Sequence, residues 1–132
     1  TIRTFDPELR KEIYNEIKQI AKGVETATGA NIKVEFDVGG FYPVTYNNIA
    51  LGERMKQSLI EATNGNFAEI TRRTGAEDFS YFSQEIPGLY IFLGVNDPGK
   101  LEQAGNHSPY FTVNDDALDE GLKSLVYMTI DY

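Results

Sequence analysis

A strict alternation of apolar and charged residues over 32–38 constrains the fold of this chain more than any other feature. Four apolar side chains alternate with three charged ones, namely Ile32, Val34, Phe36 and Val38 with Lys33, Glu35 and Asp37. Side chains of a strand point alternately to its two faces, so this period of two predicts a half-buried strand. One face should pack on the preceding element, and the other should face water.

The residues before this strand predict a short strand over 1–5 and then an amphipathic helix. Asp6 and Pro7 are a typical helix start, and the helix should end near Thr28 and Gly29. Its apolar side chains recur at helical spacing, at Leu9, Ile13, Ile17, Ile20 and Val24. Strand, helix and strand in this order form half of a ferredoxin-like sandwich, which rarely makes a stable core alone. A missing upstream half or a second copy of the chain should complete it.

Beyond a break at Gly39–Pro43, helices and short strands are expected to alternate again. A helix should follow Asn47 or Asn48, carry Leu51, Met55, Leu59 and Ala62 on one face and end at Asn64–Gly65. A short strand should follow at 67–70, and further helices should run from Glu77 to Gln84 and begin at Asn114–Asp116. The last helix carries Leu118, Leu122, Leu125 and Thr129 on one face, and a buried strand is expected over 89–94. The pattern therefore predicts an α/β chain made of two α+β lobes.

Composition excludes several kinds of partner. The 132 residues carry a net charge of −8, which argues against nucleic acid and anionic membrane surfaces as partners. An apolar run of the length that a membrane helix needs does not occur. The chain has no cysteine, so disulfides and thiol chemistry are excluded, and we expect a cytoplasmic protein.

His107 is the only histidine and the first candidate for chemistry. It follows the apolar run and the Asn96–Gly99 turn, and it precedes Ser108 and Pro109. A neutral imidazole is a good ligand for zinc, manganese or nickel, although a lone histidine also fits a structural or surface role. The adjacent acids Glu77 and Asp78 fit the first turn of a helix, or they support a metal-binding loop by hydrogen bonds. Arg3 is either a solvated strand residue or a contact for a carboxylate.

Three ordered motifs carry a family resemblance. GAEDFSYF, PGLYIFLG and HSPYF, followed by an acidic-capped helix, resemble the carboxy-terminal end of the zinc amidohydrolases. These are enzymes of the aminoacylase, hippurate hydrolase and auxin-conjugate hydrolase type, in the aminoacylase and carboxypeptidase metallopeptidase superfamily. The opening TIRTFDPELR resembles the second half of that family's inserted lid, or dimerisation, domain.

The resemblance implies a chain with two parts and an incomplete active site. Residues 1–42 would be the second half of the lid domain, and residues 43–132 the carboxy-terminal part of an α/β zinc-peptidase-like catalytic domain. His107 would bind one of two divalent ions in the full-length parent, whose general base would lie upstream. The parent would hydrolyse N-acyl amino acids, amino-acid conjugates or small peptides and form a homodimer through the lid lobe.

The resemblance also implies that the isolated piece has no catalytic residue of its own. We expect it to be inactive and to hold no metal. The alternative from the residues is a non-catalytic dimerisation or binding module, because a lobe of strand and amphipathic helix fits that function equally well.

Overall fold

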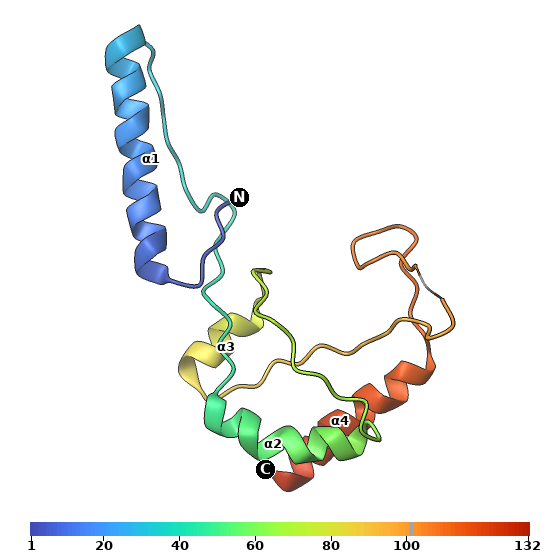
Figure 1. The fold of residues 1–132 in the computed structure, drawn as a ribbon. Coiled ribbons are helices and arrows are strands. Elements are labelled where there is room, and N and C mark those ends of the chain that lie inside the picture. Colours follow the sequence, from blue (N-terminus) through green and yellow to red (C-terminus); the bar gives the residue numbers. More distant parts are fainter. Residues whose placement is uncertain (101) are drawn as a thin grey trace. The chain divides into compact units, whose positions relative to one another are not determined.

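The computed structural model describes residues 1–100 and 102–132, and the regular elements in this part are helices (Figure 1). They are α1 (Pro7–Thr28), α2 (Ile49–Ala62), α3 (Phe79–Glu85) and α4 (Asp116–Asp131). The chain divides into two compact units. Unit 1 contains Thr1–Tyr46 and Thr71–Pro87, and unit 2 contains Asn47–Ile70 and Gly88–Tyr132.

The predicted α/β class is wrong for the described residues, which contain no strand. The segments 1–5, 32–38, 67–70 and 89–94 form no strand, because they do not pair with a neighbouring backbone. The physical reason is that alternation predicts which side chains a segment buries, whereas a strand also needs a neighbouring backbone to pair with. The predicted half-sandwich over 1–38 is therefore a helix packed against an unpaired segment.

Helix α1 begins and ends where the sequence predicts. The Asp6 carboxylate accepts hydrogen bonds from the backbone N–H groups of Glu8 and Leu9, at 2.8 and 3.3 Å. Gly29 ends the helix in the left-handed region at φ 74°, and its N–H donates to the Glu25 carbonyl. Glycine adopts this conformation without a Cβ clash, which explains why the helix stops here.

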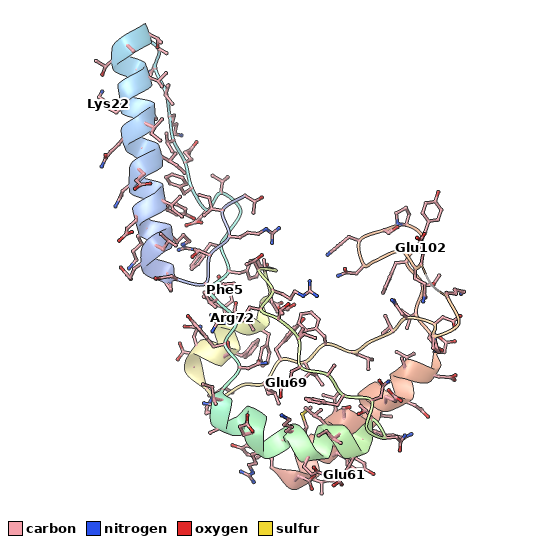
Figure 2. All side chains as sticks on the ribbon, viewed as in Figure 1. Phe5, Lys22, Glu61, Glu69, Arg72 and Glu102 are labelled. Carbon is pink, nitrogen blue, oxygen red and sulfur yellow. The ribbon has the colours of Figure 1, made fainter. Side chains whose placement is uncertain are left out.

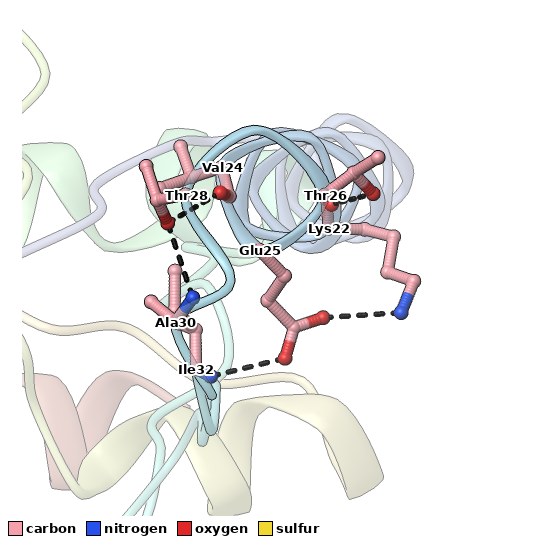
Figure 3. Close-up of polar contacts among 7 residues, drawn as sticks. All are labelled: Lys22, Val24, Glu25, Thr26, Thr28, Ala30 and Ile32. Atoms are coloured by element: carbon pink, nitrogen blue, oxygen red, sulfur yellow. Dashed lines mark hydrogen bonds and ion pairs between the residues drawn. The ribbon is translucent and has the colours of Figure 1, made fainter.

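Unit 1 packs α1 against the segment that follows it (Figure 1). Tyr14 and Phe36 stack with ring centroids 4.0 Å apart, and the Tyr14 hydroxyl donates to Asp37 at 2.7 Å. Glu25 accepts from the Ile32 N–H at 3.0 Å and from Lys22 at 3.2 Å (Figure 3). Exposure alternates along 32–37 as predicted, with the apolar residues half-buried and the charged ones exposed. Val38 departs from the alternation because 81% of it is exposed.

Unit 2 is built on the packing of α2 against α4, which lie side by side (Figure 1). The buried side chains of α2 are Met55, Ser58, Leu59 and Ala62, which confirms most of the predicted face. On α4 the buried residues are Ala117 and Ser124. The leucines of α4, Leu118, Leu122 and Leu125, lie elsewhere on the helix and are exposed.

The predicted start and end of α2 are confirmed. The Asn48 side chain accepts from the Leu51 N–H at 2.9 Å, which caps the first turn. Asn64 and Gly65 leave the helix with φ of 51° and 84°. The segment that follows is held back onto α2 by an ion pair between Lys56 and Glu69, the latter labelled in Figure 2.

An extended segment, residues 88–95, is fixed onto the helix pair at both ends. The Asn47 side chain donates to the Tyr90 carbonyl at 2.9 Å and accepts from the Tyr90 N–H at 2.7 Å. The Asn48 N–H donates to the Gly88 carbonyl at 2.9 Å. Further along, Leu93 lies against Gly121 of α4. The segment therefore runs on a defined path into the loop that carries His107.

Candidate functional site

His107 lies at the surface of unit 2 in a turn between the extended segment and α4. Its backbone has φ 70°, in the left-handed region that residues other than glycine adopt uncommonly. Two hydrogen bonds flank it, from the Ser108 N–H to the Gly105 carbonyl at 3.2 Å and from the Phe111 N–H to the Ser108 carbonyl at 3.1 Å. The imidazole of His107 is therefore carried on a turn and is exposed.

The loop that carries His107 is closed at its base. The Asn114 N–H donates to the Val95 carbonyl at 2.9 Å and joins the entry of the loop to its exit. Within the loop, the Gln103 side chain accepts from the Asp97 N–H at 3.0 Å and donates to the Asp97 carbonyl at 2.9 Å. These bonds connect the described residues on either side of position 101, and nothing in the sequence distinguishes Gln103.

Asp97 adds an electrostatic contact to this loop. Its carboxylate accepts from the Gly99 N–H at 3.1 Å and forms an ion pair with Lys100 at 3.2 Å. The backbone hydrogen bond and then the Lys100 ammonium hold the pKa of Asp97 below its ordinary value. The Asn96–Gly99 turn predicted from the sequence is therefore stabilised by its own aspartate.

Glu77 and Asp78 lie at the start of α3 in unit 1, whereas His107 belongs to unit 2. The Glu77 carbonyl accepts from the N–H and the hydroxyl of Ser80, and the Asp78 carbonyl accepts from the Tyr81 N–H at 3.0 Å. The Asp78 side chain makes no capping hydrogen bond to the helix. Their role beside a metal-binding loop stays a prediction.

No group of three or more potential metal ligands gathers among residues 1–100 and 102–132. Within this part of the chain, His107 offers one imidazole donor on an exposed turn. A zinc site built from protein requires about three ligands, so these described residues do not form a complete one.

Arg3, expected to be either a solvated strand residue or a contact for a carboxylate, is engaged within unit 1. Its guanidinium donates to the Thr74 carbonyl at 2.6 Å while the side chain stays exposed. A carbonyl partner leaves other N–H groups of the guanidinium able to bind a carboxylate.

Among the described residues, no helix is both long and apolar enough to cross a membrane.

Comparison with known proteins places the chain in a family. Residues 5–131 match the peptidase family M20/M25/M40, and the chain belongs to that family. It is 30% identical, over its full length, to the IAA-amino acid hydrolase ILR1-like 4 of Arabidopsis thaliana, of which it covers 31%. It is 31% identical to thermostable carboxypeptidase 2 of Saccharolobus solfataricus, with 100% of this chain and 33% of that protein aligned.

A third relative, the N-acetyldiaminopimelate deacetylase of Limosilactobacillus reuteri, is 30% identical over 95% of this chain and 31% of its own length. The chain thus spans about a third of the length of these curated relatives. No solved structure matches the chain. The expected resemblance to amidohydrolases and carboxypeptidases is confirmed, since the names of these relatives describe hydrolysis of amino-acid conjugates, peptides or acetylated amino acids.

Proposed function

We propose that this chain is the carboxy-terminal part of a metal-dependent amidohydrolase that acts on N-acyl amino acids, amino-acid conjugates or small peptides. The observation that carries the proposal is the family match over residues 5–131 together with an exposed imidazole on a braced loop. The reaction adds water across an amide and releases a carboxylate and an amine. The domain division at residues 42 and 43, the lid-mediated homodimer and a cytoplasmic location remain parts of this proposal.

His107 is proposed as a ligand for one of two divalent ions, with zinc, manganese and nickel all compatible with an imidazole donor. Such ions supply Lewis-acid activation of water and of the amide carbonyl. The role of this chain is to present the His107 ring on a loop whose ends are joined by the Val95–Asn114 hydrogen bond and whose Asp97 is held by Gln103. Glu77 and Asp78 enter the proposal as supporting carboxylates, and the chain by itself is proposed to be inactive.

The test uses the full-length protein that contains this chain. Purified protein is assayed on a panel of N-acyl amino acids with zinc, manganese or nickel, and bound metal is measured by mass spectrometry. His107→Ala should lose one ion and more than the roughly 10–100-fold of activity that loss of a supporting residue costs. The neighbouring exposed Asn106 provides the matched control, because Asn106→Ala alters the same turn without removing a proposed ligand.

Two outcomes oppose the proposal. If His107→Ala keeps both the metal content and the turnover of the parent, His107 is not a ligand. If the full-length protein hydrolyses none of the amides and binds no divalent ion, the non-catalytic binding module becomes the better interpretation.

A further inference from the structure

Two adjacent arginines of unit 1, Arg72 and Arg73, make no ion pair, hydrogen bond or ring contact with another described residue. We call them the arginine pair. Both are exposed, on the irregular segment that precedes α3. Every other described lysine or arginine side chain of unit 1 contacts a carboxylate, a carbonyl or an aromatic ring, namely Arg3, Arg10, Lys11, Lys18, Lys22 and Lys33. The arginine pair is therefore available to a ligand.

A third guanidinium group lies close to the arginine pair. Arg3 donates to the Thr74 carbonyl at 2.6 Å, so the amino-terminal segment and the segment that carries the pair lie side by side. The Tyr46 hydroxyl donates to the Phe5 carbonyl at 3.3 Å and anchors the amino-terminal segment in turn. Figure 2 labels Phe5 and Arg72 in this part of unit 1. Three guanidinium groups are thus carried on two segments that hydrogen bonds hold together.

The chemistry of the arginine pair favours an anion with a planar pair of oxygens. A guanidinium group presents its N–H donors in a fixed fork, which matches the two oxygens of a carboxylate. The whole chain carries a net charge of −8, which repels anionic molecules. Two unpaired positive charges oppose this repulsion at one place, so an anion should bind there rather than elsewhere on the surface.

The arginine pair lies a short distance along the chain from Glu77 and Asp78, the proposed supporting carboxylates. Four residues separate Arg73 from Glu77, and an extended chain spans at most about 3.6 Å per residue, so their Cα atoms lie within about 14 Å of each other. An N-acyl amino acid with a neutral side chain offers one carboxylate, for which Arg3 alone is a sufficient partner. The arginine pair exceeds that need and suits a substrate with a second carboxylate.

We propose that Arg72 and Arg73 bind a carboxylate in the side chain of the substrate, so that the full-length hydrolase prefers N-acyl derivatives of acidic amino acids to those of neutral ones. The inference rests on the proposed function, because it names the substrate class of the same amide-hydrolysing site. Arg72 and Arg73 are specificity determinants in this proposal and take no part in the cleavage of the amide.

The test compares two substrates that differ in this charge alone, N-acetylglutamate and its neutral isostere N-acetylglutamine. The kcat/KM of the full-length protein is measured on both, and binding of both to the metal-free protein is measured by calorimetry. The parent should prefer N-acetylglutamate. Arg72→Gln with Arg73→Gln should lower the ratio of the two kcat/KM values about tenfold or more, as expected when hydrogen bonds to a charged group are lost. The matched control, Lys11→Gln with Lys33→Gln, removes the same charge from exposed positions of unit 1 and should leave the ratio unchanged.

Three kinetic results would overturn the inference. The first is an unchanged ratio in the arginine double variant. The second is an equal loss on both substrates, because the arginines would then bind the α-carboxylate that both share. The third is an equal fall of the ratio in the lysine control, because net charge would then set the preference.

Calorimetry separates this inference from the proposed function. Charge-selective binding that depends on the arginine pair, in a protein that hydrolyses neither substrate, supports the carboxylate site and removes the proposed function. Hydrolysis of both substrates without such selectivity does the reverse. If the full-length protein binds and hydrolyses neither substrate, both proposals fail.

Discussion

Gly121 of α4 and Leu93 of the extended segment approach so closely that a Cβ on Gly121 would lie 2.8 Å from a Leu93 methyl carbon. The close approach fixes the carboxyl end of the extended segment against α4. A glycine inside a helix costs about 1 kcal/mol relative to alanine, so this contact offsets part of that cost through packing.

The first prediction concerns this contact. Gly121→Ala should change stability little, because the gain in helix propensity opposes a clash that the half-exposed Leu93 side chain can relieve. Gly121→Val should destabilise the chain by about 1–3 kcal/mol, as overpacking usually does. Urea unfolding of the single variants and of the double variant with Leu93→Ala measures the coupling. If Gly121→Val lowers the free energy of unfolding equally in the Leu93 and the Leu93→Ala backgrounds, the predicted clash does not occur.

A second prediction concerns the Asn47 side-chain amide, which makes two hydrogen bonds to the Tyr90 backbone where a neighbouring strand would otherwise pair. Asn47→Ala removes both hydrogen bonds to Tyr90 and should cost about 1–2 kcal/mol of unfolding free energy. Asn47→Asp keeps an acceptor for the Tyr90 N–H but sets a carboxylate against the Tyr90 carbonyl, so it should not restore the lost stability. Hydrogen exchange at the Tyr90 amide is the readout. Unchanged exchange in Asn47→Ala would show that the side chain does not hold the segment.

The third prediction follows from Glu25, which joins α1 to residue 32 (Figure 3). The Ile32 N–H, and after it Lys22, lower the pKa of Glu25 below its ordinary value. Stability from this contact is therefore complete above the pKa of the unfolded chain and is lost as the pH falls through the lower folded value. The Ile32 amide signal in NMR should titrate below the ordinary glutamate value of about 4.3. Glu25→Gln, which cannot titrate, should abolish that step, and a step at the ordinary value would refute the assignment.

The fourth prediction uses the backbone of His107. Its φ of 70° favours glycine, so His107→Gly should stabilise the isolated chain relative to His107→Ala by about 1 kcal/mol. His107→Val should be the least stable of the three, because a β-branched residue fits this region worst. Thermal unfolding of the isolated chain ranks the variants. If all three melt together, the turn relaxes and the positive φ places no constraint on the residue.

Helix ends were predictable because their causes are local. Asp6, Gly29, Asn48 and Gly65 act within one turn of the residues that they cap, so a short window of sequence contains the whole interaction. The extended segments failed as strands for the opposite reason, since pairing depends on residues remote in sequence. Asn47 and Asn48 illustrate this. The Asn47 side chain bonds Tyr90 and the Asn48 side chain caps α2, but the local sequence does not show which asparagine has which partner.

The candidate site also combines features that the sequence predicts with features that it does not. His107 could be singled out as the lone histidine after an apolar run, and the turn at Asp97 was visible as Asn96–Gly99. The brace from Gln103 was not, because one glutamine in a loop gives no pattern to recognise. The small residues of α4 were also missed, since a search for large apolar side chains passes over Ala117 and Ser124.

The hydrogen bond between Val95 and Asn114 separates the loop from the framework that carries it. With its two ends joined, this stretch can gain or lose residues over evolutionary time without parting the extended segment from α4. Each doubling of a flexible loop costs only about 0.6 kcal/mol in closure entropy. A change of length between Val95 and Asn114 would therefore spare the supporting helices but displace His107, so the proposed metal role limits the length of this loop.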